Sequence, residues 1–214
     1  MRNRFDEQLF ELNREIIEMG AMCEESITCA TKSLILSDIN LANKVKRNSK
    51  LIDYCERKIE RNCMKLLLQQ QPVASDLRSI SAALKIITDM ERIGKQAKDI
   101  AEIATSMHQH PIKGMKIIVD IAQETTNMVT SCIDAFVKKD LILAEKVIAQ
   151  DNVIDNYFFK VKNDIITMIS EKSNDGEIVL DFLMISKYFE RIGDHAVNIA
   201  EWVIYSITGT HKEV

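Results

Sequence analysis

Glycine and proline, the residues that most often turn a chain or end a helix, are scarce in this sequence, where 214 residues include only 6 Gly and 2 Pro. A β-sandwich or β-barrel needs a turn about every 8–12 residues, which this chain cannot supply. Apolar side chains instead recur every three or four residues over long segments, and this spacing places them on one face of an α-helix. The sequence therefore predicts an all-α protein of long helices joined by short connections.

The periodicity divides the chain into six predicted helices. Breaks are expected at Pro72, at Pro111 and in the loop 173–176, because proline disfavours helix and Ser-Asn-Asp-Gly is typical of a loop. The predicted helices cover about residues 5–36, 38–68, 75–107, 112–138, 140–172 and 177–207. Helices of about 30 residues are about 45 Å long, and this length favours antiparallel bundles with short connections.

The chain also repeats itself. Residues 84–104 and 183–203 are identical at ten of 21 positions at an offset of 99, and residues 38–53 match residues 140–155 at an offset of 102. Repetition over such a length predicts two copies of one structural unit. We therefore expect two tandem three-helix bundles, residues 1–109 and 110–214, packed side by side through their apolar faces.

Composition excludes several classes of protein. Lys and Arg number 28 against 32 Asp and Glu, a net charge of −4 that argues against nucleic-acid binding. No stretch approaches 18 uncharged apolar residues and the first twenty residues resemble no signal peptide, so we expect no membrane insertion. The five cysteines form no CxxC pair. We interpret them as small buried residues in a reducing cytoplasm.

Four acidic residues are the candidate ligands of a metal site. Asp151 and Asp155 are one turn apart on the fifth predicted helix, and Glu190 and Asp194 are one turn apart on the sixth. If these helices are neighbours, the four carboxylates meet on the outer surface of the second unit. Such a cluster needs a counter-charge, and all-oxygen ligands suit hard cations or iron. On spacing alone, an ordinary solvated acidic face is the favoured interpretation, because acidic pairs at this spacing are common on exposed helices.

Two motifs resemble those of a known family. Residues 190–201, ERIGDHAVNIAE, closely resemble the ERIGDxAxNIAE stretch of the PhoU family, and residues 71–78, QPVASDLR, resemble that family's linker into its third helix. The resemblance covers nearly the whole chain. It implies a cytoplasmic, usually homodimeric regulator that keeps phosphate uptake and the starvation response low when phosphate is plentiful. The implied partners are the ATPase subunit of the ATP-driven phosphate transporter and the sensor histidine kinase of the starvation response.

The resemblance also implies metal binding through paired E(D)xxxD motifs, with iron, zinc or magnesium as a single ion or a multinuclear cluster. The second repeat has both motifs, as the four acids named above. In the first repeat only Asp53 and Glu91 remain, and Ser49 and Lys95 stand at the other two positions. Coulomb attraction favours pairing of Lys95 with Asp53 or Glu91 over binding of a cation. We therefore predict one functional metal site, in the second repeat, and a degenerate site in the first.

Other functions agree less well with the sequence. A carboxylate-bridged di-iron enzyme needs Glu-x-x-His pairs, and none of the four histidines has Glu three residues before it. No Gly-rich phosphate loop or Ser-His-Asp pattern is present in the sequence, so no enzymatic activity is expected. Two alternatives remain open: a helical scaffold that acts without metal, and an accessory regulator of a different phosphate permease.

Overall fold

The computed structural model describes residues 2–69, 73–107, 115–170 and 176–210, and across these ranges every regular element is a helix. The all-α prediction is confirmed, and each predicted helix is found with ends that differ by at most three residues. The six helices are α1 (Arg2–Leu36), α2 (Ile39–Gln69), α3 (Ala74–Ser106), α4 (Met115–Lys138), α5 (Leu141–Ser170) and α6 (Gly176–Thr208).

The turns between α1 and α2 and between α4 and α5 are built in the same way. Ser37 and Lys139 both have φ of 51°, a left-handed conformation that often ends a helix. The amides of Asp38 and Asp140 then donate to carbonyls five residues earlier, at 3.1 and 2.9 Å. Each aspartate also caps the next helix, since its Oδ1 accepts from the amide three residues later. The two turns are equivalent at the sequence offset of 102.

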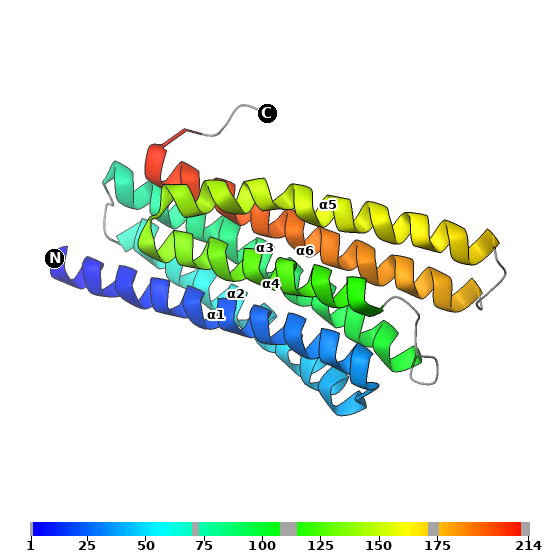
Figure 1. Ribbon diagram of the computed structural model, residues 1–214. Coiled ribbons are helices and arrows are strands. Elements are labelled where there is room, and N and C mark those ends of the chain that lie inside the picture. The colour runs from blue at the N-terminus through cyan, green and yellow to red at the C-terminus, as the bar shows by residue number, and fades with distance from the viewer. Residues whose placement is uncertain (1, 70–72, 108–114, 171–175, 211–214) are drawn as a thin grey trace.

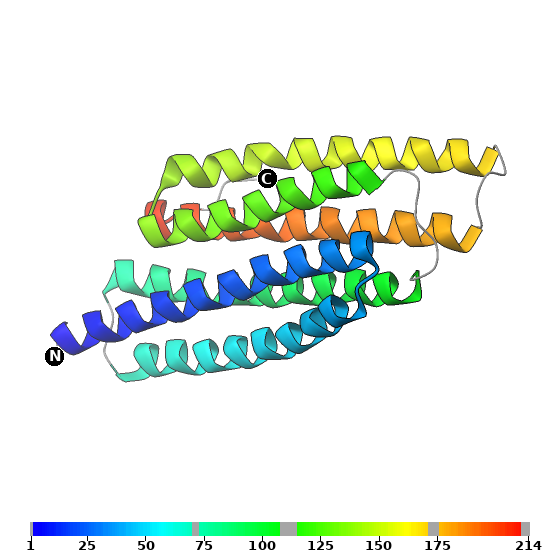
Figure 2. The same ribbon diagram turned by 60° about the horizontal axis from the view of Figure 1, so that its bottom comes forward.

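The helices form two bundles that lie side by side, α1–α3 and α4–α6 (Figure 1). Between the bundles, α3 packs against α6 and α1 packs against α4. The pattern of contacts is unchanged when α1, α2 and α3 are exchanged with α4, α5 and α6, so the two repeats are related by an approximate two-fold axis. Figure 2 shows α2 and α5 on opposite outer sides of the molecule. The predicted domain boundary, between residues 109 and 110, falls outside the described residues.

The core consists mainly of aliphatic side chains, each of which stabilises the fold by about 1.5–3 kcal/mol when fully buried. One face of α6 is formed by apolar residues that are all buried. These residues are Ile185, Phe189, Ile192, Ala196, Ile199 and Val203. Two glycines lie inside helices at contacts with a neighbour, because Gly94 packs against Ile52 of α2 and Gly193 packs against Ile154 of α5. Among the residues described, no helix combines the length and apolar character needed to cross a bilayer.

Candidate functional site

The packing of α5 on α6 brings the four predicted ligands close enough for their charges to interact. We call Asp151, Asp155, Glu190 and Asp194 the acidic cluster. The pKa of Asp151 is raised to about 6, mainly by partial burial and further by the negative charges of Asp155, Asp194 and Glu190. Burial and the charge of Glu190 likewise raise the pKa of Asp194. The two pairs of acids therefore lie close enough for their charges to interact, as the helix periodicity of the sequence predicted.

The four acids differ in their exposure to solvent. Asp155 and Asp194 are exposed and Asp151 is half-buried. Glu190 was expected to point outward, but its side chain is only 14% exposed. It lies beside α5 and forms an ion pair with Lys187 of its own helix. The ammonium of Lys187 also lies 5.3 Å from the centre of the Phe158 ring on α5, so one cation partly balances the four carboxylates.

The donor chemistry of the acidic cluster fits a hard cation, because every candidate ligand atom is a carboxylate oxygen. A cation would lower the repulsion that raises the pKa of Asp151. The position that a Cβ would occupy at Gly193 is 3.8 Å from Asp151 Oδ1, so the glycine leaves room beside this carboxylate. In the side-chain positions described, no three Asp, Glu, His or Cys residues converge closely enough to hold an ion. Binding a metal therefore requires the carboxylates to rotate toward one another.

The degenerate site of the first repeat contains its own cation. Lys95 Nζ lies 2.5 Å from Oε1 of Glu91, as expected from the sequence, and Asp53 pairs with Arg57 instead. A third acid, Glu56, was missed by the sequence analysis. Burial raises its pKa, and the charges of Glu91, Glu60 and Asp53 raise it further. Glu56 is three residues after Asp53, so the two side chains are neighbours on α2, and this spacing was the signal that could have revealed it.

A partly buried polar contact joins the two repeats next to the acidic cluster. Asp89 of α3 is buried, and its Oδ1 lies 2.9 Å from Nδ1 of His195 on α6. The Nδ2 of Asn198 donates to the same oxygen at 3.4 Å. Since an ionised carboxylate can only accept, Nδ1 of His195 donates. His195 directly follows Asp194 in the chain, so the helix that carries half of the acidic cluster is tied to the first repeat.

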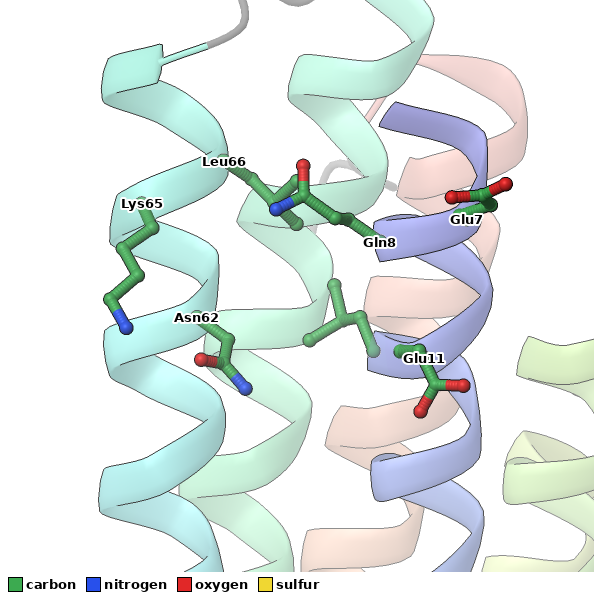
Figure 3. A pocket seen from close by; sticks show the side chains of 7 residues that line it. Glu7, Gln8, Glu11, Asn62, Lys65 and Leu66 are labelled. Carbon is green, nitrogen blue, oxygen red and sulfur yellow. The ribbon is translucent and has the colours of Figure 1, made fainter. Parts of the chain in front are cut away.

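A separate groove of about 360 Å³ lies between α1 and α2 (Figure 3). Leu12 and Leu66 contribute apolar surface, and Glu7 and Glu11 give its α1 side a negative charge. No predicted site residue lines this groove. It lies in the first repeat and is therefore separate from the acidic cluster.

Comparison with known proteins shows what the chain is similar to. The model of the PhoU domain matches residues 16–104 and again residues 118–203. The phosphate-specific transport system accessory protein PhoU homolog of Clostridium acetobutylicum is 34% identical, over 100% of this chain and 98% of that protein. The crystal structure of PhoU from Pseudomonas aeruginosa superposes with a TM-score of 0.92 at 33% identity, over 96% of this chain and 100% of that one. PhoU from Streptococcus pneumoniae, described as a phosphate transport system regulatory protein, is 23% identical with a TM-score of 0.91 and shares the fold.

Proposed function

Because the chain belongs to the PhoU family, we propose that it is a cytoplasmic negative regulator of phosphate uptake and of the phosphate-starvation response. The similarity over its full length to relatives named as accessory proteins of the phosphate-specific transport system is the observation that carries the proposal. An accessory role also favours action through protein contacts over catalysis. The proposed assembly is a homodimer that binds the transporter's ATPase subunit and the sensor histidine kinase.

Deletion of the gene tests the regulatory role. At high phosphate, the deletion strain is expected to take up phosphate faster and to express a starvation reporter that the parent keeps silent. Unchanged uptake and reporter activity would overturn the proposal. A pull-down with the tagged full-length protein, at high and at low phosphate, tests the partners. Recovery of the ATPase subunit and the kinase is expected, with amounts that depend on phosphate.

We further propose that the acidic cluster binds a metal: iron, zinc or magnesium, as a single ion or a multinuclear cluster. A metal bound there would supply positive charge to the four carboxylates, of which Glu190 already forms an ion pair with Lys187 of α6. Support comes from the four oxygen donors and from the partial burial and mutual repulsion that together raise the pKa of Asp151 to about 6.

Metal analysis of the purified protein tests this site. A variant with Asp155→Ala and Glu190→Ala is expected to lose the metal that the wild type retains. The matched control carries Asp53→Ala and Glu91→Ala, which remove the equivalent acids of the first repeat, and should keep its metal. Equal metal content in the wild type and the first variant would contradict the proposal.

One observation favours a second candidate, a helical scaffold that regulates without metal. In the described side-chain positions the acidic cluster does not converge on a single point, and Glu190 already has Lys187 as a partner. Normal binding of the ATPase subunit and kinase after replacement of all four acids would support the scaffold. If a different phosphate permease is the target, its gene rather than the transporter genes should neighbour this one.

A further inference from the structure

The outer face of α2 is strongly basic. Among the described helices, α2 packs only against α1 and α3, so its opposite side faces away from the other helices at one edge of the molecule (Figure 2). At about 100° per residue, six cationic residues of α2 fall within an arc of about 100°, opposite the buried seam of the helix. We call them the basic face: Lys46, Arg47, Lys50, Arg57, Arg61 and Lys65.

Most of this charge is unbalanced. Arg57 pairs with Asp53, but the described part of the chain provides no ion pair to the other five cations. Figure 3 shows the side chain of Lys65 extended away from Glu7 and Glu11. The three acids of α2 lie outside the arc. The basic face therefore concentrates positive charge in a protein whose net charge is −4.

Exposed apolar side chains lie among these cations. Tyr54, Met64 and Leu68 fall within the same arc and are 60%, 47% and 80% exposed. From Arg47 to Leu68 the face is about 30 Å long, given a rise of about 1.5 Å per residue. A stripe of this length that combines Lys and Arg with large apolar side chains is typical of a helix that lies on an anionic membrane surface.

The second repeat has no equivalent face, although α5 occupies the equivalent place in the fold. α2 contains eight Lys or Arg and three acids, whereas α5 contains three Lys and four acids. The difference is therefore specific to one repeat. Because α2 and α5 are on opposite outer sides, contact through α2 would keep the acidic cluster of α5 and α6 away from the contacting surface.

We propose that the basic face of α2 binds the surface of a membrane that contains anionic phospholipids. The cations pair with lipid phosphates, and Tyr54, Met64 and Leu68 enter the boundary between headgroups and acyl chains. The face is one side of a single protruding helix, a shape that suits a broad lipid surface. An acidic protein or a nucleic acid matches the charge but leaves the exposed apolar side chains unexplained. The proposal does not depend on the regulatory function, because it can be tested with the purified protein and lipid alone.

Sedimentation of the purified full-length protein with vesicles tests the proposal. Binding is expected to vesicles of phosphatidylcholine mixed with phosphatidylglycerol, to weaken as salt is added, and to be absent with phosphatidylcholine alone. A variant with Arg47→Glu, Lys50→Glu and Arg61→Glu should bind these vesicles with an affinity that is lower by a factor of about one hundred or more.

The matched control places the same charge change on α5, with Lys146→Glu, Lys160→Glu and Lys162→Glu. These three lysines are exposed, and the control should bind nearly as well as the wild type. Circular dichroism should show equal helix content in all three proteins. Failure of the wild type to bind the mixed vesicles, or equal loss in both variants, would overturn the proposal. The first of these results would direct the search to an acidic protein partner.

Discussion

Gly94 of α3 lies so close to Ile52 of α2 that a Cβ at position 94 would be 2.8 Å from the Cδ1 of Ile52. Ile52 is fully buried and is enclosed by other side chains. At the equivalent position of the second repeat, a Cβ on Gly193 would be 3.5 Å from Ile154, an ordinary van der Waals distance. The same sequence motif therefore permits a tight contact in one repeat and a relaxed one in the other.

We predict opposite effects of alanine at these two glycines. Alanine is favoured over glycine within a helix by about 1 kcal/mol, but overpacking a core costs about 1–3 kcal/mol. Gly94→Ala should therefore lower the free energy of unfolding by about 1 kcal/mol, and Gly193→Ala should raise it by up to about 1 kcal/mol. Urea unfolding followed by circular dichroism measures both. Greater stability of the Gly94 variant than of the Gly193 variant would contradict this packing.

Asp151 should make the metal-free protein less stable as the pH rises. Its pKa is raised from 3.8 to about 6 in the folded state, so between these values the folded protein holds a proton that the unfolded chain has released. The free energy of unfolding should therefore fall from about pH 4 to about pH 6. Asp151→Asn should reduce this slope and stabilise the protein at neutral pH by about 1 kcal/mol, since water still screens the carboxylate. Chemical unfolding across this pH range, with chelator present, measures the slope.

A control for this prediction is Asp164→Asn, which removes an exposed acid from the same helix. Such surface changes alter stability by about 0.5 kcal/mol or less. If both variants change the slope equally, the effect belongs to the overall charge and not to the acidic cluster.

Metal capacity should increase when the degenerate site is repaired. A variant with Ser49→Asp and Lys95→Asp would restore both missing acids and remove the ammonium that pairs with Glu91. Metal analysis should find about twice the wild-type content, as expected for two equivalent sites. Lys95→Ala alone adds no ligand and should leave the content unchanged. It should also destabilise the protein by about 1–3 kcal/mol, because Glu91 is buried and would lose its partner.

The contact between Asp89 and His195 should stabilise the packing of one repeat on the other. Asp89→Ala should lower the free energy of unfolding by about 1–2 kcal/mol, since a partly buried donor on His195 would lose its acceptor. A double-mutant cycle with His195→Ala should give a coupling energy of about 1 kcal/mol or more. Additive effects would show that the two side chains do not stabilise each other.

Much of the fold could be predicted because its determinants are local. The three- and four-residue spacing located the helices, Asp38 and Asp140 marked two of their starts, and the internal repeat gave the tandem arrangement. The proximity of the two acidic pairs followed from helix periodicity once α5 and α6 were taken as neighbours. Apart from the repeat and the assumption that α5 and α6 are neighbours, these features depend on a few successive turns of one helix.

The features that were missed depend on contacts between distant parts of the chain. Glu190 was expected to face outward by helix periodicity, but its side chain is only 14% exposed in the packed bundle. Asp89 and His195 are 106 residues apart, and only the packing of α3 on α6 identifies them as partners. The basic face of α2 is visible in the sequence as charge, but its exposure depends on which neighbours the helix has.

The counter-charge of the first repeat is a side chain of the protein itself, Lys95, and this distinguishes the two halves of the molecule. The first repeat carries its neutralising ammonium within its own polypeptide, so the composition of the medium has little influence on that half. The second repeat has four carboxylates and one lysine beside them, and the remaining charge must be compensated by whatever ions the solution offers. Two halves with the same architecture should therefore differ in sensitivity to their ionic surroundings, and any response to those surroundings should begin at α5 and α6.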